Sequence, residues 1–434
     1  MTCKGDMMRK LGLRSGSGAV CVTLVFLAAA LIGGRASGQE RVFVTDGGNT
    51  GDTLLVLDTS SLPTITPIHV GTRPTGVAVR PDGAFAYVTN TLDGTISVVN
   101  TALNAAVATV SIGSMARPRG IAVTPDGSQA YVANRSAGSV SVIDLSSNVV
   151  IHTIPVPGTP TGVAINPSGT FAFVTKAANA QVAQIDVQAV PPSVVRDIDV
   201  GVTPQGIAVR PGGRFVYVCN AGGGGTVSVI DTLLNPPLVT ATIPISNGPV
   251  AVAFLPDGTR AYVTRHSNAT VAVIDANVTA FIKAITVGMS PSGVASTAAG
   301  DRVYITNMAG QSLSVIDPST NMVVNTIPMP GVNPLGIAIA AIGTPVNTPT
   351  RTPMSGGTPT STMTPQPMLS PTSTEQPTRT PKPGHGPNSM SPHAAPVAVC
   401  IARCRLETST VSDYLACKDL CPRGPKPTQT GGPS

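Results

Sequence analysis

The chain has 434 residues, contains no tryptophan, and carries a formal net charge of +6. That charge is unevenly spread, because residues 39–343 hold 14 Lys/Arg and 16 Asp/Glu, a net charge of −2, while both flanking segments are basic. A near-neutral central region lacks the basic surface of a nucleic-acid-binding protein, so we do not expect a nucleic-acid partner.

Residues 1–38 have the pattern of a secretory signal peptide. A basic start is followed by an apolar stretch over about 19–32, and Ala36-Ser37-Gly38 fits a small-x-small cleavage site. We therefore expect export and no membrane-spanning segment after cleavage, because no other stretch is long and apolar enough to cross a bilayer. An uncleaved membrane anchor is the alternative interpretation of this segment.

A unit of 42 to 45 residues recurs seven times in residues 39–343. Each unit opens with a Pro-x-Gly-like tripeptide, at Pro74, Pro118, Pro160, Pro204, Pro249, Pro291 and Pro334. A period of this length with strand-like content predicts a β-propeller with one blade per repeat.

The first full unit predicts four antiparallel strands. A β-branched stretch follows Pro74, and Pro81-Asp82-Gly83 then forms a turn. Further strands are predicted over 86–90, 95–100 and 108–112, separated by polar turns. Four such strands joined by short turns make one blade.

Three features recur at fixed places in the repeat. The second strand carries an aromatic residue, at Phe43, Tyr87, Tyr131, Phe173, Tyr217, Tyr262 and Tyr304. The third strand ends in an acidic or amide residue, at Asp58, Asn100, Asp144, Asp186, Asp231, Asp275 and Asp317. The opening tripeptide holds glycine in six units and Ala251 in the other. Small residues are expected there, because blades taper toward the axis and their backbones approach closely.

The two ends of the repeat region are predicted to share the seventh blade. The last unit supplies one strand, 335–341, and the segment before Pro74 supplies three, over 41–46, 53–58 and 67–70. This pairing removes the free sheet edges that an open ring would leave.

The second strand reads Tyr-Val-Thr-Asn at 87–90, with variants at 131–134, 217–220 and 304–307. With the Pro-x-Gly opening and the Ser-Val-Ile-Asp third strand, this resembles the YVTN family of WD40-like β-propeller repeats. The resemblance covers all seven units and implies a seven-bladed propeller in an extracytoplasmic bacterial or archaeal protein. We therefore expect a periplasmic, cell-surface or secreted bacterial protein. The wider family is similar to partner-binding propellers, lactonases and subunits of quinone-linked dehydrogenases, so the resemblance fixes no reaction.

The composition changes after residue 343. Thr, Pro and Ser dominate residues 344–396, and proline at this density predicts a disordered, semi-extended linker, either a plain spacer or an O-glycosylated one. Residues 397–421 contain two Cys-x3-Cys pairs, Cys400 with Cys404 and Cys417 with Cys421. A disordered tail is predicted over 422–434.

Four-residue spacing places both cysteines of a pair on one face of a helix. Two short antiparallel helices, about 395–406 and 411–420, would allow bridges Cys400–Cys421 and Cys404–Cys417, and the pattern is similar to twin Cys-x3-Cys helical hairpins. Disulfides are the expected state in an exported protein. A zinc site is the alternative.

Propeller sites usually lie at the mouth of the central channel, so residues that break the repeat near that face are the candidates. Arg73, Arg117 and Arg119 lie beside opening prolines. At the Asn position of the second strand stand Asp46, Lys176 and Arg265, and His266 follows the last of these. Such residues would make a basic rim suited to a carboxylate, a phosphate or an acidic glycan. The alternative is that they are ordinary solvated loop charges.

The propeller region shows no catalytic constellation. Most of its acidic residues occupy repeat or turn positions, and no haem-attachment, nucleophile-elbow or P-loop motif is present. Cys219 lies inside a strand and is expected to be buried. The sequence thus predicts a monomeric exported binding scaffold without cofactor or metal, whose partner is a protein, a glycan or a small anionic ligand. The alternative is a lactonase-like hydrolase or an accessory propeller of a periplasmic redox enzyme.

Overall fold

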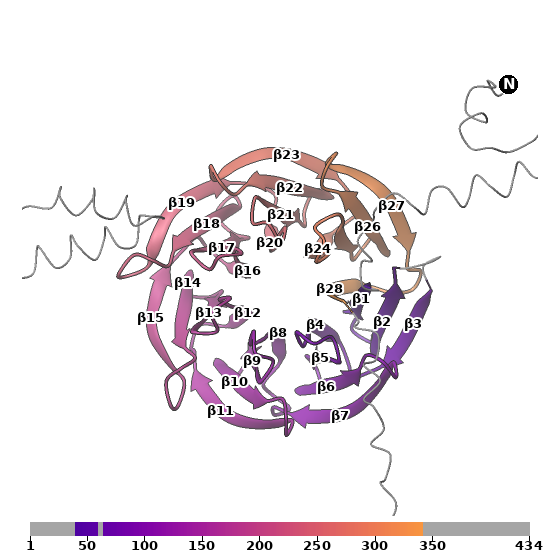
Figure 1. The fold of residues 1–434 in the computed structure, drawn as a ribbon, viewed down its shortest axis with the longest axis vertical. Coiled ribbons are helices and arrows are strands. Elements are labelled where there is room, and N and C mark those ends of the chain that lie inside the picture. Colours follow the sequence, from indigo (N-terminus) through magenta and orange to yellow (C-terminus); the bar gives the residue numbers. More distant parts are fainter. Residues whose placement is uncertain (1–39, 60–63, 342–434) are drawn as a thin grey trace, which may run out of the picture. The chain divides into compact units, whose positions relative to one another are not determined.

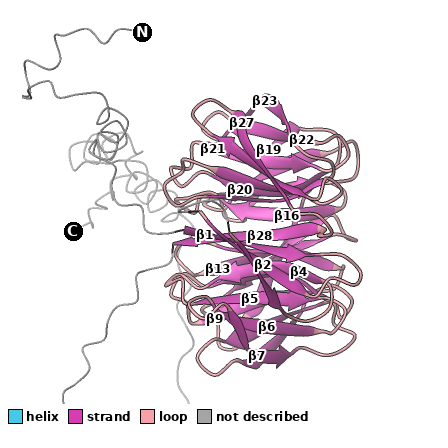
Figure 2. Cartoon of the chain, turned by 90° about the vertical axis from the view of Figure 1, so that its right-hand side faces the viewer, coloured by secondary structure: helices cyan, strands magenta, loops and turns pink. Residues whose placement is uncertain are grey.

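Seven four-stranded antiparallel sheets surround a central channel in the computed structural model, which describes residues 40–59 and 64–341 (Figure 1). The described residues form strands and loops, with no helix among them (Figure 2). The predicted all-β, seven-bladed propeller is therefore confirmed. The signal peptide, the Pro-rich linker and the Cys-x3-Cys hairpin lie outside the described residues.

Each blade is built of four strands, which follow one another in the sheet from the channel outward. The innermost strands are β4 (Pro74–Val79), β8 (Pro118–Val123), β12 (Pro160–Ile165), β16 (Pro204–Val209), β20 (Pro249–Phe254), β24 (Pro291–Ser296) and β28 (Pro334–Ala341). The second strands are β5 (Phe85–Asn90), β9 (Gln129–Asn134), β13 (Phe171–Lys176), β17 (Phe215–Asn220), β21 (Arg260–Arg265), β25 (Val303–Asn307) and β1 (Glu40–Asp46).

The two outer positions complete the blades in the same order. The third strands are β6 (Thr95–Asn100), β10 (Ser139–Asp144), β14 (Gln181–Asp186), β18 (Thr226–Asp231), β22 (Thr270–Asp275), β26 (Ser312–Asp317) and β2 (Thr53–Asp58). The outermost strands are β7 (Ala105–Ser111), β11 (Val149–Pro155), β15 (Ser193–Asp199), β19 (Leu238–Pro244), β23 (Ala280–Thr286), β27 (Met322–Pro328) and β3 (Ile65–His69).

The ring closes in the blade that joins the two ends of the repeat region. Its strand order is β28-β1-β2-β3, and β28 pairs antiparallel with β1 from Glu40 opposite Ala341 to Val44 opposite Ile337. The predicted closure is therefore confirmed. The outer strand β3 begins two residues earlier than expected, at Ile65.

The outermost strands also begin earlier than the sequence indicated. β7 starts at Ala105 rather than 108. A register shift between Val98 and Val99 lets β6 pair with residues of β7 that precede its expected start. The same irregularity recurs in the third and fourth strands of five other blades. A bulge increases local twist, which suits the strand farthest from the axis.

The acidic residues at the ends of the third strands cap the turns that follow. Asp144 Oδ1 accepts hydrogen bonds from the backbone N–H of Ser146 (2.7 Å) and of Ser147 (3.2 Å). Asn100 accepts the equivalent pair from Ala102 and Leu103. These side chains are therefore turn-forming groups rather than reactive acids.

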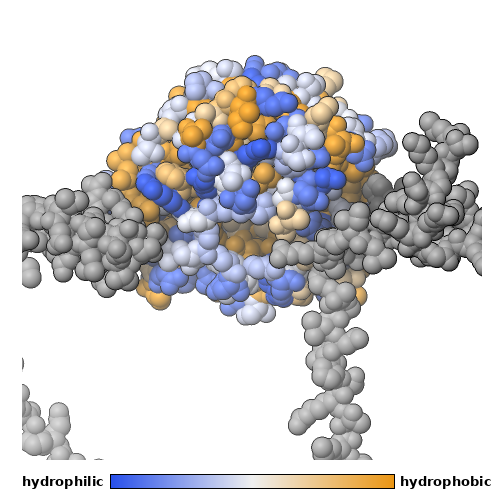
Figure 3. All heavy atoms as spheres, turned by 45° about the horizontal axis from the view of Figure 1, so that its top comes forward, coloured by the Kyte–Doolittle hydropathy of each residue, from blue (hydrophilic) through white to orange (hydrophobic). Residues whose placement is uncertain are grey.

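The hydrophobic core is divided among the interfaces between blades. Six of the seven repeat aromatics, for example, are exposed by 1% or less, and Tyr217 packs edge-to-face on Phe254 of the next blade with ring centroids 4.9 Å apart. The outermost strands are mostly exposed and bury at most one residue each, and some exposed residues are apolar, such as Phe281 and Ile282 on β23. Figure 3 accordingly shows hydrophobic and hydrophilic residues interspersed on the face it presents.

A threonine hydroxyl ties each innermost strand to the next blade at most interfaces. Thr175 Oγ1 accepts from the N–H of Gly162 in its own blade (2.8 Å) and donates to the carbonyl of Gln205 in the next (2.8 Å). Thr89 makes the same pair of bonds between its own Gly76 and the carbonyl of Arg119. Thr45, Thr264 and Thr306 repeat the arrangement, whereas Ala133 and Cys219 replace the threonine in the two remaining blades.

Glycine is required beside this bond because the next blade is so close. A Cβ added to Gly162 would lie nearer than 3.0 Å to the carbonyl oxygen of Gln205, and one added to Gly76 would clash with the carbonyl of Arg119. The recurring Pro-x-Gly and the threonine of Tyr-Val-Thr-Asn are thus two parts of one contact between blades.

We expect Thr175→Val to lower the free energy of unfolding by about 1–3 kcal/mol, because it keeps the side-chain shape but leaves a buried N–H and a carbonyl without their partner. Thr109→Val, at an exposed position on β7, is the matched control and should change stability by less than about 0.5 kcal/mol. Urea denaturation of the two variants measures the difference. Equal midpoints would show that the bridging hydroxyl adds no stability.

Candidate functional site

One mouth of the central channel is formed by the x and Gly residues of all seven opening tripeptides. They surround a cavity of about 490 Å³. The x positions hold Thr75, Arg119, Thr161, Gln205, Val250, Ser292 and Leu335. Six tripeptides hold glycine and the seventh holds Ala251, so the seven x residues contribute most of the side chains of the channel wall.

The residue that follows each second strand lies at the same face. Its N–H donates to the carbonyl of the residue before an opening proline, as from Thr91 to Arg73 (3.1 Å) and from Arg135 to Arg117 (3.2 Å). The same bond is made in the other five blades. Two loops of every blade are therefore locked together at the mouth, and His266 and Met308 reach the channel cavity from this position.

The residue before the opening proline has a left-handed backbone in six of the seven blades. Arg73 has φ of 54° and Arg117 of 51°, and Thr159, Thr203 and Ser290 adopt the same region. Glycine stands there only at Gly248. Because the conformation belongs to the repeat, it does not by itself mark a functional site. It does fix the direction in which Arg73 and Arg117 leave the backbone.

A second cavity, of about 430 Å³, opens beside the channel between the blades of β4 and β8. Four arginines line it, Arg73, Arg117, Arg119 and Arg135. The rest of its wall is formed by hydroxyl-bearing residues, Thr75, Thr91, Ser136 and Thr159. Thr75 and Arg119 also line the channel, as does Arg73, so the two cavities share a wall. We call this second cavity the arginine pocket.

No carboxylate of residues 40–59 and 64–341 neutralises the arginine pocket. Among the described residues, the four ion pairs involve other groups, and no acidic residue lines the cavity. Asp93, in the turn after Thr91, instead accepts a hydrogen bond from the backbone N–H of Thr72 (2.6 Å). The arginine pocket therefore holds a concentrated positive charge.

The electrostatics of the pocket centre on Arg119. Partial burial, together with the charges of Arg135 and Arg73, lowers the pKa of Arg119 to about 10. Arg73 contributes a second unmet group, because its Nε is buried and has no hydrogen-bond partner. The lowered pKa reflects burial and the like charges nearby, and the Nε is a buried donor without an acceptor.

The structure brings together three of the residues singled out from the sequence and separates the others. Arg73, Arg117 and Arg119 share the arginine pocket, and His266 lies at the channel cavity. Lys176 is buried and donates to Asp197 Oδ2 (2.7 Å) and Gln181 Oε1 (3.2 Å). It therefore serves the interior of its blade and lines neither of these cavities.

Asp46 and Arg265 occupy the same structural position as Lys176. Asp46 Oδ1 accepts from the N–H of Asn333 (2.9 Å) and Gly48 (3.2 Å), which closes the joint between the chain ends. Arg265 is half-buried at the end of β21, and burial lowers its pKa. In other blades the residue at this position is asparagine; Asn90 Nδ2, for example, donates to Thr95 and Ser97 of the next strand.

Sequence reasoning missed Arg135 and the threonine lining. Arg135 follows the Asn position rather than occupying it, and the residue after that position is the one that reaches the mouth. The signal was available in the repeat alignment, where the residues after Asn are Thr91, Arg135, Ala177, Ala221, His266, Met308 and, in the closing blade, Gly47. Their variability contrasts with the constancy of the strand before them.

Cys219 is fully buried between two blades, as expected, and burial raises the pKa of its thiol. It is a free cysteine within the described region. A buried thiol with a raised pKa is a poor nucleophile.

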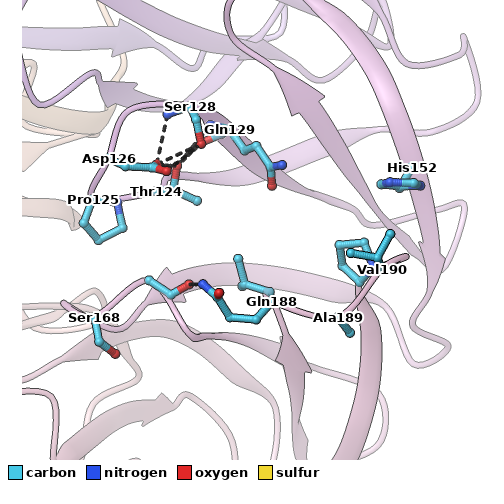
Figure 4. Close-up of a pocket in the computed structure, with 13 residues that line it drawn as sticks. Thr124, Pro125, Asp126, Ser128, Gln129, His152, Ser168, Gln188, Ala189 and Val190 are labelled. Atoms are coloured by element: carbon cyan, nitrogen blue, oxygen red, sulfur yellow. Dashed lines mark hydrogen bonds between the residues drawn. The ribbon is translucent and has the colours of Figure 1, made fainter.

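A groove of about 540 Å³ lies elsewhere, between the turns and outer strands of the blades of β8 and β12 (Figure 4). Thr124 and Ser128 both donate a hydrogen bond to Asp126 on one side, and Gln188 faces them from the other. The equivalent gap between the blades of β16 and β20 is bridged by Arg210, which donates to the carbonyls of Gly258 and Ala276. The groove is thus an interface that no arginine fills.

Within residues 40–59 and 64–341, no group of three or more His, Cys, Asp or Glu is arranged to hold a metal ion. The same residues contain no helix long and apolar enough to span a membrane.

A family model for YNCE-like β-propellers matches residues 52–212. This match and the seven-bladed architecture both fit a YVTN-type β-propeller repeat protein. The resemblance seen in the repeats is thereby confirmed. A search of curated proteins found no significant match.

Solved structures share the propeller fold at low sequence identity. A functionally unknown protein from Desulfotomaculum acetoxidans DSM 771 is 20% identical with a TM-score of 0.61, covering 70% of this chain and 99% of that one. A Bacteroides fragilis protein, provisionally assigned as a 6-phosphogluconolactonase, is 16% identical with a TM-score of 0.59, covering 71% and 100%. A dihydro-haem d1 dehydrogenase is 19% identical with a TM-score of 0.51, covering 67% and 64%.

These likenesses establish the fold alone. Matches extend to 1592 solved chains, so a propeller of this kind is too common for its shape to indicate one activity. The function has to be argued from the residues at the channel mouth.

We expect Arg119→Met to raise the free energy of unfolding of the ligand-free propeller by about 1 kcal/mol at pH 7. The lowered pKa means that the folded state disfavours the charged guanidinium, and this cost persists at every pH below about 10. The figure is set below the full shift because Arg119 is only partly buried.

Denaturation in a low-salt buffer without multivalent anions measures the effect, with Arg302→Met outside the arginine pocket as the control. A loss of stability specific to Arg119→Met would contradict the electrostatic account.

Proposed function

We propose that this chain is an exported binding scaffold that captures an anionic ligand at one mouth of its central channel. The carrying observation is the arginine pocket, where four guanidinium groups without an acidic partner adjoin the channel cavity. Export is supported by the basic and apolar pattern of residues 1–38. The ligand is a small anion, an acidic glycan or an acidic segment of a partner protein.

The rigidity of the mouth supports a binding role. Hydrogen bonds between the two loops of each blade hold the rim, and threonine bridges hold the inner strands at five interfaces. A site built on such a frame loses little conformational entropy when it binds. Guanidinium groups also suit carboxylates, phosphates and sulfates through paired N–H donors.

The first test is a thermal-shift panel on the full chain at constant ionic strength. Citrate, phosphate and polygalacturonate are the anions, and glucose is the uncharged comparison. An anion that binds only the folded state raises the melting temperature. At a hundredfold excess over Kd it adds about 2.7 kcal/mol to the free energy of unfolding. Arg119→Met should abolish the shift and Arg302→Met should retain it. Equal responses to glucose and to the anions, or shifts unchanged by Arg119→Met, would reject an anion site at the mouth.

A lactonase-like hydrolase or an accessory propeller of a redox enzyme is the second candidate. It is supported by the structural likeness to the provisional lactonase and to the dehydrogenase, and by His266 at the channel cavity. Histidine is a common general base near neutral pH. If the chain is a lactonase, it should open a lactone such as δ-gluconolactone faster than buffer does, and His266→Gln should lower that rate about 100-fold or more. Lactone hydrolysis no faster than in buffer alone would reject the lactonase hypothesis.

A further inference from the structure

We propose that the arginine pocket takes a compact head group carrying two negative charges, while the uncharged remainder of the ligand stands in the central channel. This inference rests on the proposed function and assigns the charge and layout of its ligand. The two sources of such a head are a phosphate monoester and a dicarboxylate whose two carboxylates are on the same carbon or on adjacent carbons.

The first step is the number of cations. A single carboxylate would meet one guanidinium fork and leave three arginines facing one another. Burial lowers the pKa of Arg119, and the charges of Arg135 and Arg73 lower it further, so these arginines are close enough to interact. A dianion offers acceptor oxygens on two sides and can engage two forks at once, which offsets this repulsion more completely.

The second step is the placement of the four arginines. Arg73 comes from the loop before β4, whereas Arg117, Arg119 and Arg135 come from the neighbouring blade of β8 and β9. Both loops carry their arginine at the same left-handed position. The cations therefore approach the cavity from two adjacent blades, and a head group between them can be held from both sides. Arg117 and Arg135 are exposed, whereas Arg73 and Arg119 are half-buried.

The third step is the unmet donor. Arg73 Nε is buried without a partner, although its neighbours in the cavity wall are hydroxyl groups that can accept. Thr75 and Thr91 are already committed, since their hydroxyls bond to each other (2.8 Å) and Thr91 donates to the carbonyl of Pro118 (2.7 Å). Arg196 Nε and Arg265 Nε are also buried without a partner, so this donor is compatible with a binding site at Arg73 without being specific to it.

The fourth step is the wall shared with the channel. The channel cavity is lined by glycine and by uncharged side chains such as Thr161, Gln205 and Ser292. Arg119 and Arg73 lie at its boundary with the arginine pocket, and His266 is its one further titratable lining residue. A second charged group in the channel would find no arginine beyond these two. The layout therefore separates a charged head from a neutral body of the ligand, within about 430 and 490 Å³ respectively.

The test compares matched anions by calorimetry on the full chain at constant ionic strength. Malonate is paired with acetate, and glycerol 3-phosphate is paired with dimethyl phosphate, so that each dianion has a monoanion of the same chemistry. We expect each pair's dianion to bind at least tenfold more tightly, and the better of the two dianions identifies the source of the head. Arg119→Met should weaken that dianion at least tenfold, while Arg302→Met should leave it unchanged.

Two further measurements keep the test decisive. Arg135→Gln, at an exposed position, should also weaken the dianion without affecting folding, as circular dichroism will report. Glycerol 3-phosphate should bind less tightly at pH 5 than at pH 7.5, because its second proton has a pKa of about 6, whereas the pKa of Arg119, about 10, keeps that guanidinium charged over this range. Tightening at pH 5 would contradict binding of the dianion.

The outcomes separate this inference from the proposed function. Monoanions that bind as tightly as their dianions, and that lose affinity in Arg119→Met, would overturn the two-charge head and leave an anion-binding scaffold. Dianion binding that is unchanged in both arginine variants would overturn the assignment to this pocket. Absence of binding by every anion, here and in the thermal-shift panel, would overturn both.

Discussion

The structure depends on how closely the innermost strands of neighbouring blades approach around the channel. At this distance only glycine leaves room for the next blade's carbonyl oxygen, and a threonine hydroxyl converts the close approach into two hydrogen bonds. Each blade alone is a four-stranded sheet with an apolar face on either side. Its burial therefore requires two neighbours, and the ring closes only because β28 and β1 bring the two chain ends into one sheet.

That constraint also explains where the chain is free to vary. The glycine and the threonine are held by contact between blades, but the x residue between proline and glycine contributes only its carbonyl to the bond. Its side chain points to the mouth cavity, so Arg119, Gln205 and Val250 can occupy equivalent positions without disturbing the frame. The residue after the second strand is similarly held by its backbone N–H alone. Variation at these two positions changes the chemistry of the mouth without altering the fold.

The sequence was enough for the fold because every blade repeats the same contacts. Proline, glycine, aromatic and turn residues recur at one spacing, and the structure places them as expected. The site was only partly predictable. Arg73, Arg117 and Arg119 stood out beside the prolines, but Lys176 and Asp46 stood out equally. Lys176 instead pairs inside its blade, and Asp46 bonds the loop before β28 where the chain ends meet. A sequence pattern identifies positions that depart from the repeat, whereas the direction of each side chain follows from three-dimensional pairing. The extent of β7 was missed for a related reason, since a bulge leaves no sequence signature.

The charges of the arginine pocket lower the free energy of unfolding of the propeller. Burial and two neighbouring cations disfavour the charge of Arg119, and nothing among the described residues compensates for it. Elsewhere in the ring some cations are paired with carboxylates, as Arg80 with Asp82 and Arg214 with Asp231. The four arginines that line the pocket at the channel mouth place an electrostatic cost where a ligand can remove it. Such local destabilisation is typical of binding sites, because the ligand's own charge then contributes directly to the stability of the complex.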